Sequence, residues 1–160
     1  MGLFDAFKKK EIIIAAPIQG SCVSIQEVKD PTFSGEILGK GVAIKPEDGN
    51  VYAPADGIIS TVFPTGHAVG ITTKDDVEIL IHVGIDTVKM KGRGFQVCCG
   101  NGQEVKKGDL LLQVDFGKLR EEGYDTITPV VICNADVFSK IEKNPGGKVS
   151  VGDRILTLRK

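Results

Sequence analysis

The sequence has no tryptophan, two tyrosines and only two histidines, His67 and His82. With so few large aromatic side chains, the core has to be built mainly from Val, Ile and Leu. No apolar run approaches the roughly 20 residues that a membrane-spanning helix requires, which argues against an integral membrane protein. A net charge of −1 argues against nucleic-acid binding, because proteins that bind phosphate backbones usually carry a basic footprint.

Four cysteines are present, and none has the spacing of a metal site: Cys22, Cys98, Cys99 and Cys133. Adjacent cysteines such as Cys98 and Cys99 rarely bridge each other, and no signal peptide precedes the chain. We therefore expect reduced thiols and a cytoplasmic protein.

The length of 160 residues suits one domain with at most a short appended arm. We expect an N-terminal arm over residues 1–10 and a single domain over residues 11–160. The arm is amphipathic, with Leu3, Phe4 and Phe7 ahead of three lysines, and such a segment can touch an anionic membrane surface. Ten residues make a marginal helix, so we favour a solvated tail.

From residue 11 onward, short apolar runs alternate with clusters of Gly, Pro, Asn and Asp. This pattern predicts an all-β fold, an antiparallel β-sandwich or barrel. The expected strands include residues 12–15, 42–44, 58–62, 79–85, 110–114, 128–132 and 155–158. One or two short helices are also expected, at 116–123, which ends in a glycine, and at 135–143, where Asn134 is a candidate N-cap.

Two motifs occur twice in the chain. Residues 102–114 align without gaps with residues 146–158 and share the pattern Gly-x-x-Val-x-x-Gly-Asp, and Ala-Pro-x-x-Gly occurs at 16–20 and at 53–57. The first motif predicts a tight turn between two strands, and the second a strand that follows a turn. Two copies of each predict a sheet motif that is used twice and folded face to face.

Both histidines lie on one predicted β-hairpin, residues 67–85. A turn centred between Lys74 and Asp75 would place His67 directly opposite His82. Opposed residues of an antiparallel pair have Cβ atoms about 4.5–5.5 Å apart on the same face of the sheet. The sequence therefore predicts two neighbouring imidazole rings.

Alternation along the second strand assigns the faces of this hairpin. The core face is expected to hold Val77, Ile79, Ile81 and Val83. The histidine face would carry Leu80, with Val69 and Ile71 across from it. Histidines inside an apolar rim predict a docking surface.

Two neutral imidazoles suit metal ligation, general acid–base catalysis, or carriage of a group on a ring nitrogen. A metal would want a third ligand, for which the candidates are Glu78, Asp86 and Asp30. Acid–base hydrolysis would want a Ser or Cys nucleophile, and the hairpin has neither. For phosphoryl carriage, His82 can attack, His67 can donate a hydrogen bond to the phosphate, and Thr65 can orient His67. The residues alone leave these alternatives open.

The run IHVGIDTVKMKG at residues 81–92 resembles the active-site segment of the glucose-type enzyme IIA family of the bacterial phosphoenolpyruvate-dependent sugar phosphotransferase system. Further matches follow in order along nearly the whole chain, at residues 41–46, 51–57, 65–67, 92–95 and 128–131. The resemblance implies the family's fold, a duplicated antiparallel β-sandwich, which agrees with the internal repeats.

The resemblance also implies residue roles. His82 would accept a phosphoryl group from the phosphocarrier protein HPr and pass it to a cysteine on the IIB domain of a sugar permease. His67, hydrogen-bonded to Thr65, would stabilise the transferring group. The backbone carbonyl of Gly84 would hold Nδ1–H of His82, so that Nε2 attacks.

Around the histidines, the resemblance implies a surface that binds partners. Asp30 and Asp86 would lie beside the site and meet an arginine of HPr. The apolar docking residues would be Phe33, Leu38, Phe63, Val69 and Leu80. No cofactor is required, although zinc at His67 and His82 is an alternative. The chain would meet the membrane only through the permease, and enteric relatives also bind regulatory protein targets.

Two other functions are alternatives. A zinc peptidase of the LytM kind would demand a His-x-His element, which His82-Val-Gly84 lacks. A lipoyl- or biotinyl-type carrier would place its lysine at a hairpin tip in a Met-Lys setting, and Met90-Lys91 instead follows the active-site strand.

Overall fold

The computed structural model describes residues 10–144 and 146–160, so most of the arm predicted over residues 1–10 lies outside the described residues. The strands are β1 (Glu11–Ala15), β2 (Gly20–Ser24), β3 (Lys40–Pro46), β4 (Asn50–Tyr52), β5 (Gly57–Val62), β6 (Ala68–Thr73), β7 (Glu78–His82), β8 (Phe95–Val97), β9 (Glu104–Val105), β10 (Leu110–Val114), β11 (Thr128–Ile132), β12 (Lys140–Lys143), β13 (Gly147–Val149) and β14 (Arg154–Arg159). The helices are α2 (Pro31–Ser34) and α3 (Phe116–Glu121), with 3₁₀ turns η1 (Ile25–Glu27), η2 (Thr87–Met90) and η3 (Ala135–Val137). No helix among these is long and apolar enough to cross a membrane.

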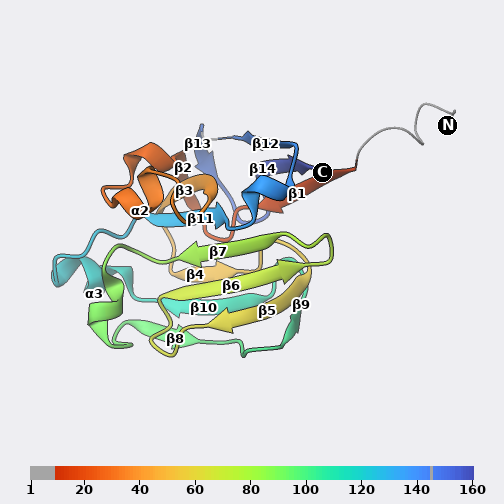
Figure 1. The fold of residues 1–160 in the computed structure, drawn as a ribbon. Coiled ribbons are helices and arrows are strands. Elements are labelled where there is room, and N and C mark those ends of the chain that lie inside the picture. Colours follow the sequence, from red (N-terminus) through yellow and green to blue (C-terminus); the bar gives the residue numbers. More distant parts are fainter. Residues whose placement is uncertain (1–9, 145) are drawn as a thin grey trace, which may run out of the picture.

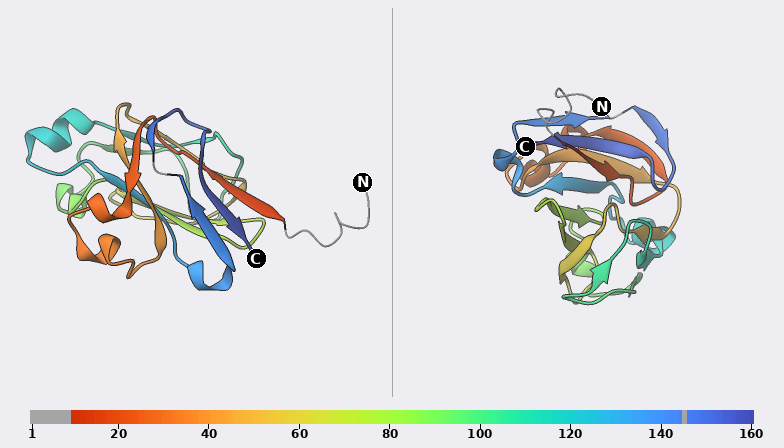
Figure 2. Two further views of the ribbon diagram at one scale, coloured as in Figure 1. Left: turned by 90° about the horizontal axis from the view of Figure 1, so that it is seen from above. Right: turned by 90° about the vertical axis from the view of Figure 1, so that its right-hand side faces the viewer.

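Every strand pairing is antiparallel, which confirms the predicted all-β class. An eight-stranded sheet has the order β13-β2-β3-β11-β7-β6-β5-β9, and two three-stranded sheets have the orders β1-β14-β12 and β4-β10-β8. Figures 1 and 2 show two halves, with one small sheet in each, and the large sheet running through both. The halves meet where β11 pairs with β7.

Two apolar clusters hold the strands together. The main cluster is almost wholly aliphatic and draws on both halves, from Ile14 of β1 to Leu112 of β10. A smaller cluster lies beneath η1 and α2, where Phe33 packs with Val131 of β11 and the half-buried Leu80 of β7. β7 therefore presents Ile79 and Ile81 to the main core, and Leu80 to the smaller cluster.

The two copies of the Gly-Asp motif make the same turn, as the repeat predicts. Gly108 and Asp109 connect β9 to β10, and Gly152 and Asp153 connect β13 to β14. Both glycines have positive φ, 93° and 95°, a conformation that costs glycine little. Both aspartate side chains accept the backbone N–H three residues earlier, at 2.9 and 2.8 Å.

Each Gly-Asp turn is bonded to one copy of the Ala-Pro motif. Ala53 donates its N–H to the carbonyl of Asp109 at 2.8 Å, and Ala16 donates its N–H to the carbonyl of Asp153 at 2.7 Å. A second matched pair of bonds crosses between the Ala-Pro copies: Ala15 N–H to Pro54 O at 3.0 Å, and Tyr52 N–H to Pro17 O at 2.8 Å. The repeats therefore join the two halves through equivalent backbone contacts.

Of the two predicted helices, one is correct and one is wrong. Residues 116–121 form α3, and the Asp115 side chain caps it. Residues 135–143 contain only the turn η3 before the chain continues as β12, in which Ile141 pairs with Leu158 of β14. Asn134 makes no side-chain cap, because its amide bonds the backbone of Glu78 and Asp76 instead. The backbone hydrogen bonds that β12 makes with β14 therefore outweigh the weak helical spacing of apolar residues in 135–143.

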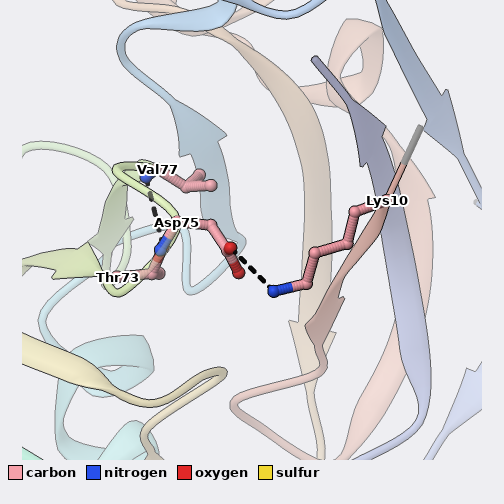
Figure 3. A network of polar contacts seen from close by, with 4 residues as sticks. All are labelled: Lys10, Thr73, Asp75 and Val77. Atoms are coloured by element: carbon pink, nitrogen blue, oxygen red, sulfur yellow. Dashed lines mark hydrogen bonds and ion pairs between the residues drawn. The ribbon is translucent and has the colours of Figure 1, made fainter. Parts of the chain in front are cut away.

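The predicted register of the hairpin is wrong by one residue. Its loop contains three residues, 74–76, since Thr73 pairs with Val77. Asp76 is left-handed, with φ of 60°, as the last residue of a three-residue hairpin loop often is. The Thr73 hydroxyl accepts the N–H of Val77 at 3.1 Å, and Lys10 reaches Asp75 at 3.0 Å (Figure 3).

Candidate functional site

The corrected register places Ala68, and not His67, opposite His82. It also pairs Val69 with Ile81 and Ile71 with Ile79. A shift of one residue exchanges the faces of a strand, so Val69 and Ile71 face the main core and have no exposed surface. Val69 therefore cannot contact a partner protein, and its predicted place in the docking surface is wrong.

The two imidazoles are neighbours in spite of this shift. Their ring centroids are 5.2 Å apart, with an edge-to-face angle of 79°. His67 lies one residue before β6, directly after Gly66, whose φ is 76°. The alternation of side chains between the two faces of the sheet therefore does not fix the direction of the His67 side chain. Its backbone remains attached, because the N–H of Val83 donates to the carbonyl of His67 at 2.7 Å.

The tautomer of His82 follows from one hydrogen bond. Nδ1 lies 2.7 Å from the carbonyl oxygen of Gly84, and a carbonyl can only accept, so Nδ1 carries the proton. In the neutral ring the other nitrogen, Nε2, then holds a lone pair. The geometry places a nucleophilic nitrogen on a half-buried histidine.

The ring of His67 is held by the side chain of Thr65. The Thr65 hydroxyl lies 2.5 Å from Nδ1 of His67. When the hydroxyl donates to Nδ1, the proton of the neutral ring lies on Nε2, and Nε2 is then a donor. His67 itself is only 3% exposed. A ring this restricted is suited to hold an oxyanion in a fixed direction.

Two phenylalanines flank the histidines. The ring of Phe33 lies 5.0 Å from that of His82 at a tilt of 55°, and the ring of Phe63 lies 5.1 Å from that of His67 at 81°. The order Phe33, His82, His67, Phe63 is thus a row of four rings in contact. Such neighbours limit ring rotation and exclude water from the imidazoles.

Burial keeps both imidazoles neutral. Burial, with a smaller contribution from the nearby His82, lowers the pKa of His67 from 6.5 to about 4. Burial also lowers the pKa of His82, against the opposing effects of the Gly84 carbonyl, Asp30 and Asp86. At neutral pH both rings are therefore uncharged, and Nε2 of His82 holds its lone pair.

The two acidic residues come from different segments on either side of His82. Asp30 caps α2, and its side chain accepts the N–H of Thr32 at 3.0 Å. Asp86 precedes η2 in a left-handed conformation, with φ of 60°, and makes no side-chain cap. The negative charge of each carboxylate raises the pKa of His82, because it favours the protonated ring.

The predicted apolar docking residues differ in exposure. Leu38 and Phe63 are each 40% exposed and Leu80 is half-buried, whereas Phe33 is 3% exposed and supports the ring of His82 from beneath. Two further residues are more exposed, Ile37 at 73% and Val88 at 51%. Ile37 adjoins Leu38, and Val88 lies in η2. Neither residue belongs to a pattern in the sequence, and neither was predicted as part of the docking surface.

Metal ligation lacks a third protein ligand in this arrangement. Within residues 10–144 and 146–160, no three His, Cys, Asp or Glu side chains are grouped to hold a metal ion. The predicted third ligands, Glu78, Asp30 and Asp86, therefore do not complete a cluster with the two histidines.

The chain is similar to known proteins over most of its length. Residues 12–138 match the family model described as phosphoenolpyruvate-dependent sugar phosphotransferase system, EIIA 1. The glucose-specific EIIA component of Bacillus cereus is 46% identical over 145 residues, which cover 91% of this chain and 88% of that protein. The glucose-specific EIIA component of Buchnera aphidicola is 41% identical over 152 residues, covering 95% and 94%.

Two further similarities concern a longer protein and a solved structure. The glucoside-specific EIICBA component of Staphylococcus carnosus is 44% identical over 144 residues, which cover 90% of this chain and 21% of that protein. The structure of glucose permease IIA from Mycoplasma capricolum superposes with a TM-score of 0.89 at 36% identity, covering 98% of this chain and 99% of that one. This likeness confirms the predicted β-sandwich.

Proposed function

The chain belongs to the EIIA family of the phosphoenolpyruvate-dependent sugar phosphotransferase system, and we propose that it carries a phosphoryl group on Nε2 of His82. In the first step, the N–P bond of phosphorylated HPr breaks as a bond from phosphorus to Nε2 of His82 forms. In the second, that bond breaks as a cysteine thiolate of a IIB domain takes the phosphoryl group. The relatives are named for glucose and glucosides, but neither step requires contact with sugar.

The observation that carries this proposal is the hydrogen bond from Nδ1 of His82 to the Gly84 carbonyl. It reserves Nε2 for bond formation, and the lowered pKa of His82 keeps that nitrogen unprotonated at neutral pH. Once Nε2 is phosphorylated, the ring becomes an imidazolium. The Gly84 carbonyl, Asp30 and Asp86 then stabilise its positive charge, since all three favour the protonated ring.

His67 acts on the phosphoryl group and not on the nucleophile. With Thr65 donating to its Nδ1, Nε2–H of His67 is available to a phosphoryl oxygen near His82. Phosphoryl transfer depends mainly on positioning and on stabilising charge that spreads over the equatorial oxygens. A donor that is already oriented contributes at little cost in reorganisation.

The exposed apolar residues around the site serve protein partners. Donor and acceptor are side chains of other proteins, so the site must be open and shallow. Leu38 and Phe63 provide apolar area, and Asp30 and Asp86 provide negative charge for an arginine of HPr. The EIICBA name of the Staphylococcus carnosus relative, of which this chain matches 21%, supports IIB as the other partner. Both transfers would take place in the cytoplasm, and contact with the membrane would come through the permease.

The proposed transfer needs no cofactor, and zinc binding is a separate proposal. Two imidazoles at 5.2 Å can supply two ligands of a tetrahedral zinc site, and the others would have to come from water or a partner. Such binding would compete with phosphorylation, because it would use the ring nitrogens of His67 and His82. A regulatory target protein would use the same apolar surface.

The deciding experiment is reconstitution with labelled phosphoenolpyruvate, enzyme I and HPr. The wild-type chain should take up an acid-labile, base-stable label. His82→Ala should take up none, whereas His67→Ala should take up label but pass it poorly to a IIB domain. Label on both variants, or on neither, contradicts the assignment of roles.

A further inference from the structure

The peptide group that joins Gly84 to Ile85 is held at both ends. Its carbonyl oxygen accepts Nδ1–H of His82 at 2.7 Å, and its N–H donates to the carbonyl of Asp125 at 3.0 Å. In a trans peptide these two groups point in opposite directions within one plane. Fixing the N–H on Asp125 therefore also fixes the direction of the carbonyl that selects the tautomer of His82.

Thr87 holds the adjoining peptide group from the opposite side. Its side chain is fully buried, and its hydroxyl donates to the carbonyl of Val83 at 2.5 Å. Its Cγ2 packs so closely on Gly84 that a Cβ at that position would approach it to 2.6 Å. Val83 also donates its N–H to His67 at 2.7 Å. Thr87 thus supports the short link between the two histidine backbones.

We propose that Thr87 is a positioning residue, whose hydroxyl holds the carbonyl of Val83, and with it Gly84, so that the Gly84 carbonyl keeps the proton of His82 on Nδ1. The expected effect of Thr87 on phosphoryl uptake rests on the proposed function, whereas the tautomer of His82 is a property of the unphosphorylated protein. The hydroxyl of Thr87 bonds to the backbone carbonyl of Val83 and not to an imidazole ring.

The physical reason is the cost of an unpaired buried acceptor. Without the hydroxyl, the carbonyl of Val83 loses its partner in a buried setting, and the backbone gains by turning it toward another donor. Gly84 is the residue whose backbone dihedral angles can change to allow this rotation, because it has no Cβ and already has a φ of 75°. Rotation there would move the carbonyl away from Nδ1 and release the proton to either nitrogen.

The test uses ¹⁵N NMR of the imidazole nitrogens at pH 8, together with the rate of phosphoryl uptake from phosphorylated HPr. Wild type should show His82 protonated on Nδ1. Thr87→Val keeps the shape but removes the hydroxyl, so it should show a mixture of tautomers and uptake that is roughly ten- to hundredfold slower. Thr87→Ser should restore both the wild-type tautomer of His82 and the wild-type rate of uptake.

The matched control is Thr73→Val, which removes another buried hydroxyl at the far end of the same hairpin. It should keep the wild-type tautomer and uptake rate. Wild-type ring signals in Thr87→Val would overturn the proposal, and so would mixed signals in Thr87→Ser. If Thr87→Val does not fold, Thr87→Ala is compared with Thr87→Ser. If the wild type takes up no label, the proposed function fails, but the ring measurement still decides the role of Thr87.

Discussion

The N–H of Val83 and the carbonyl of His67 form a hydrogen bond of 2.7 Å, which ties the residue after one candidate histidine to the backbone of the other. The imidazoles stay 5.2 Å apart because of this bond and the contacts around it, although they do not pair across the sheet. The spacing of the two histidines therefore depends on the backbone conformation at the start of β6 and at the end of β7, where the chain leaves the sheet.

Substituting alanine for Gly84 should both destabilise the protein and impair the site. The new Cβ would meet Thr87 Cγ2 at 2.6 Å and the Asp125 carbonyl at 3.0 Å, at a φ of 75°. We expect a loss of about 2–4 kcal/mol in the free energy of unfolding, measured in urea, and slower phosphoryl uptake.

The control for this substitution is Gly102→Ala. Gly102 has nearly the same φ, 79°, and no atom lies within 4 Å of a Cβ built there. Gly102→Ala therefore measures only the free-energy cost of placing alanine in a left-handed backbone conformation, about 1–2 kcal/mol. It should leave phosphoryl uptake unchanged. Equal losses in the two variants would show that packing against Thr87 contributes nothing.

Removing the Thr65 hydroxyl should slow transfer with little effect on the fold. In Thr65→Val, Nδ1 of His67 loses its partner at 2.5 Å, so the ring no longer presents Nε2–H in one direction. We expect a drop of roughly ten- to hundredfold in the rate of transfer to IIB, followed with labelled protein. Thr65→Ser should recover most of it, and an unchanged rate in Thr65→Val would refute the role of the hydroxyl.

The stability of the protein should fall as the pH falls from about 6.5 to about 4. In the unfolded chain His67 takes up its proton near its ordinary pKa of 6.5, whereas in the folded chain its pKa is about 4. Between these values the unfolded state binds more protons, so acid favours unfolding, and below about pH 4 the contribution of His67 is lost completely. Its size is at most about 3 kcal/mol.

The measurement is urea unfolding of wild type and His67→Gln at several pH values. His67→Gln should show a shallower fall in the free energy of unfolding across this window. The remaining slope includes His82, whose pKa is lowered as well. Identical slopes for the two proteins would mean that His67 is not held neutral by burial.

Truncating Phe63 should weaken partner binding more than folding. Phe63 is 40% exposed and its ring touches His67, so Phe63→Ala should reduce affinity for HPr about tenfold. The control is Ile58→Ala, because Ile58 is 51% exposed on β5, the strand that ends next to Phe63. Calorimetric titration with HPr should show weaker binding for Phe63→Ala than for Ile58→Ala. Equal affinities of the two variants would place the docking surface elsewhere.

Much of the fold was predictable because it depends on local chemistry. The Gly-Asp turns follow from glycines at positive φ and aspartates that bond their own turn. By contrast, the strands β4, β8 and β12 were missed. They have three to four residues each, and only pairing with a neighbour makes so short a segment a strand.

For the site, the sequence by itself determined the residue types and their order: two histidines, a threonine two residues before the first, and a glycine two residues after the second. Tertiary structure decided the register, because packing of β6 and β7 within the large sheet and against the main core leaves a three-residue loop that ends at left-handed Asp76. It thereby buried Val69, and it brought Asp125, which is distant in sequence, to the backbone of Ile85. Which nitrogen carries a proton depends on such contacts across the fold, and no local pattern encodes them.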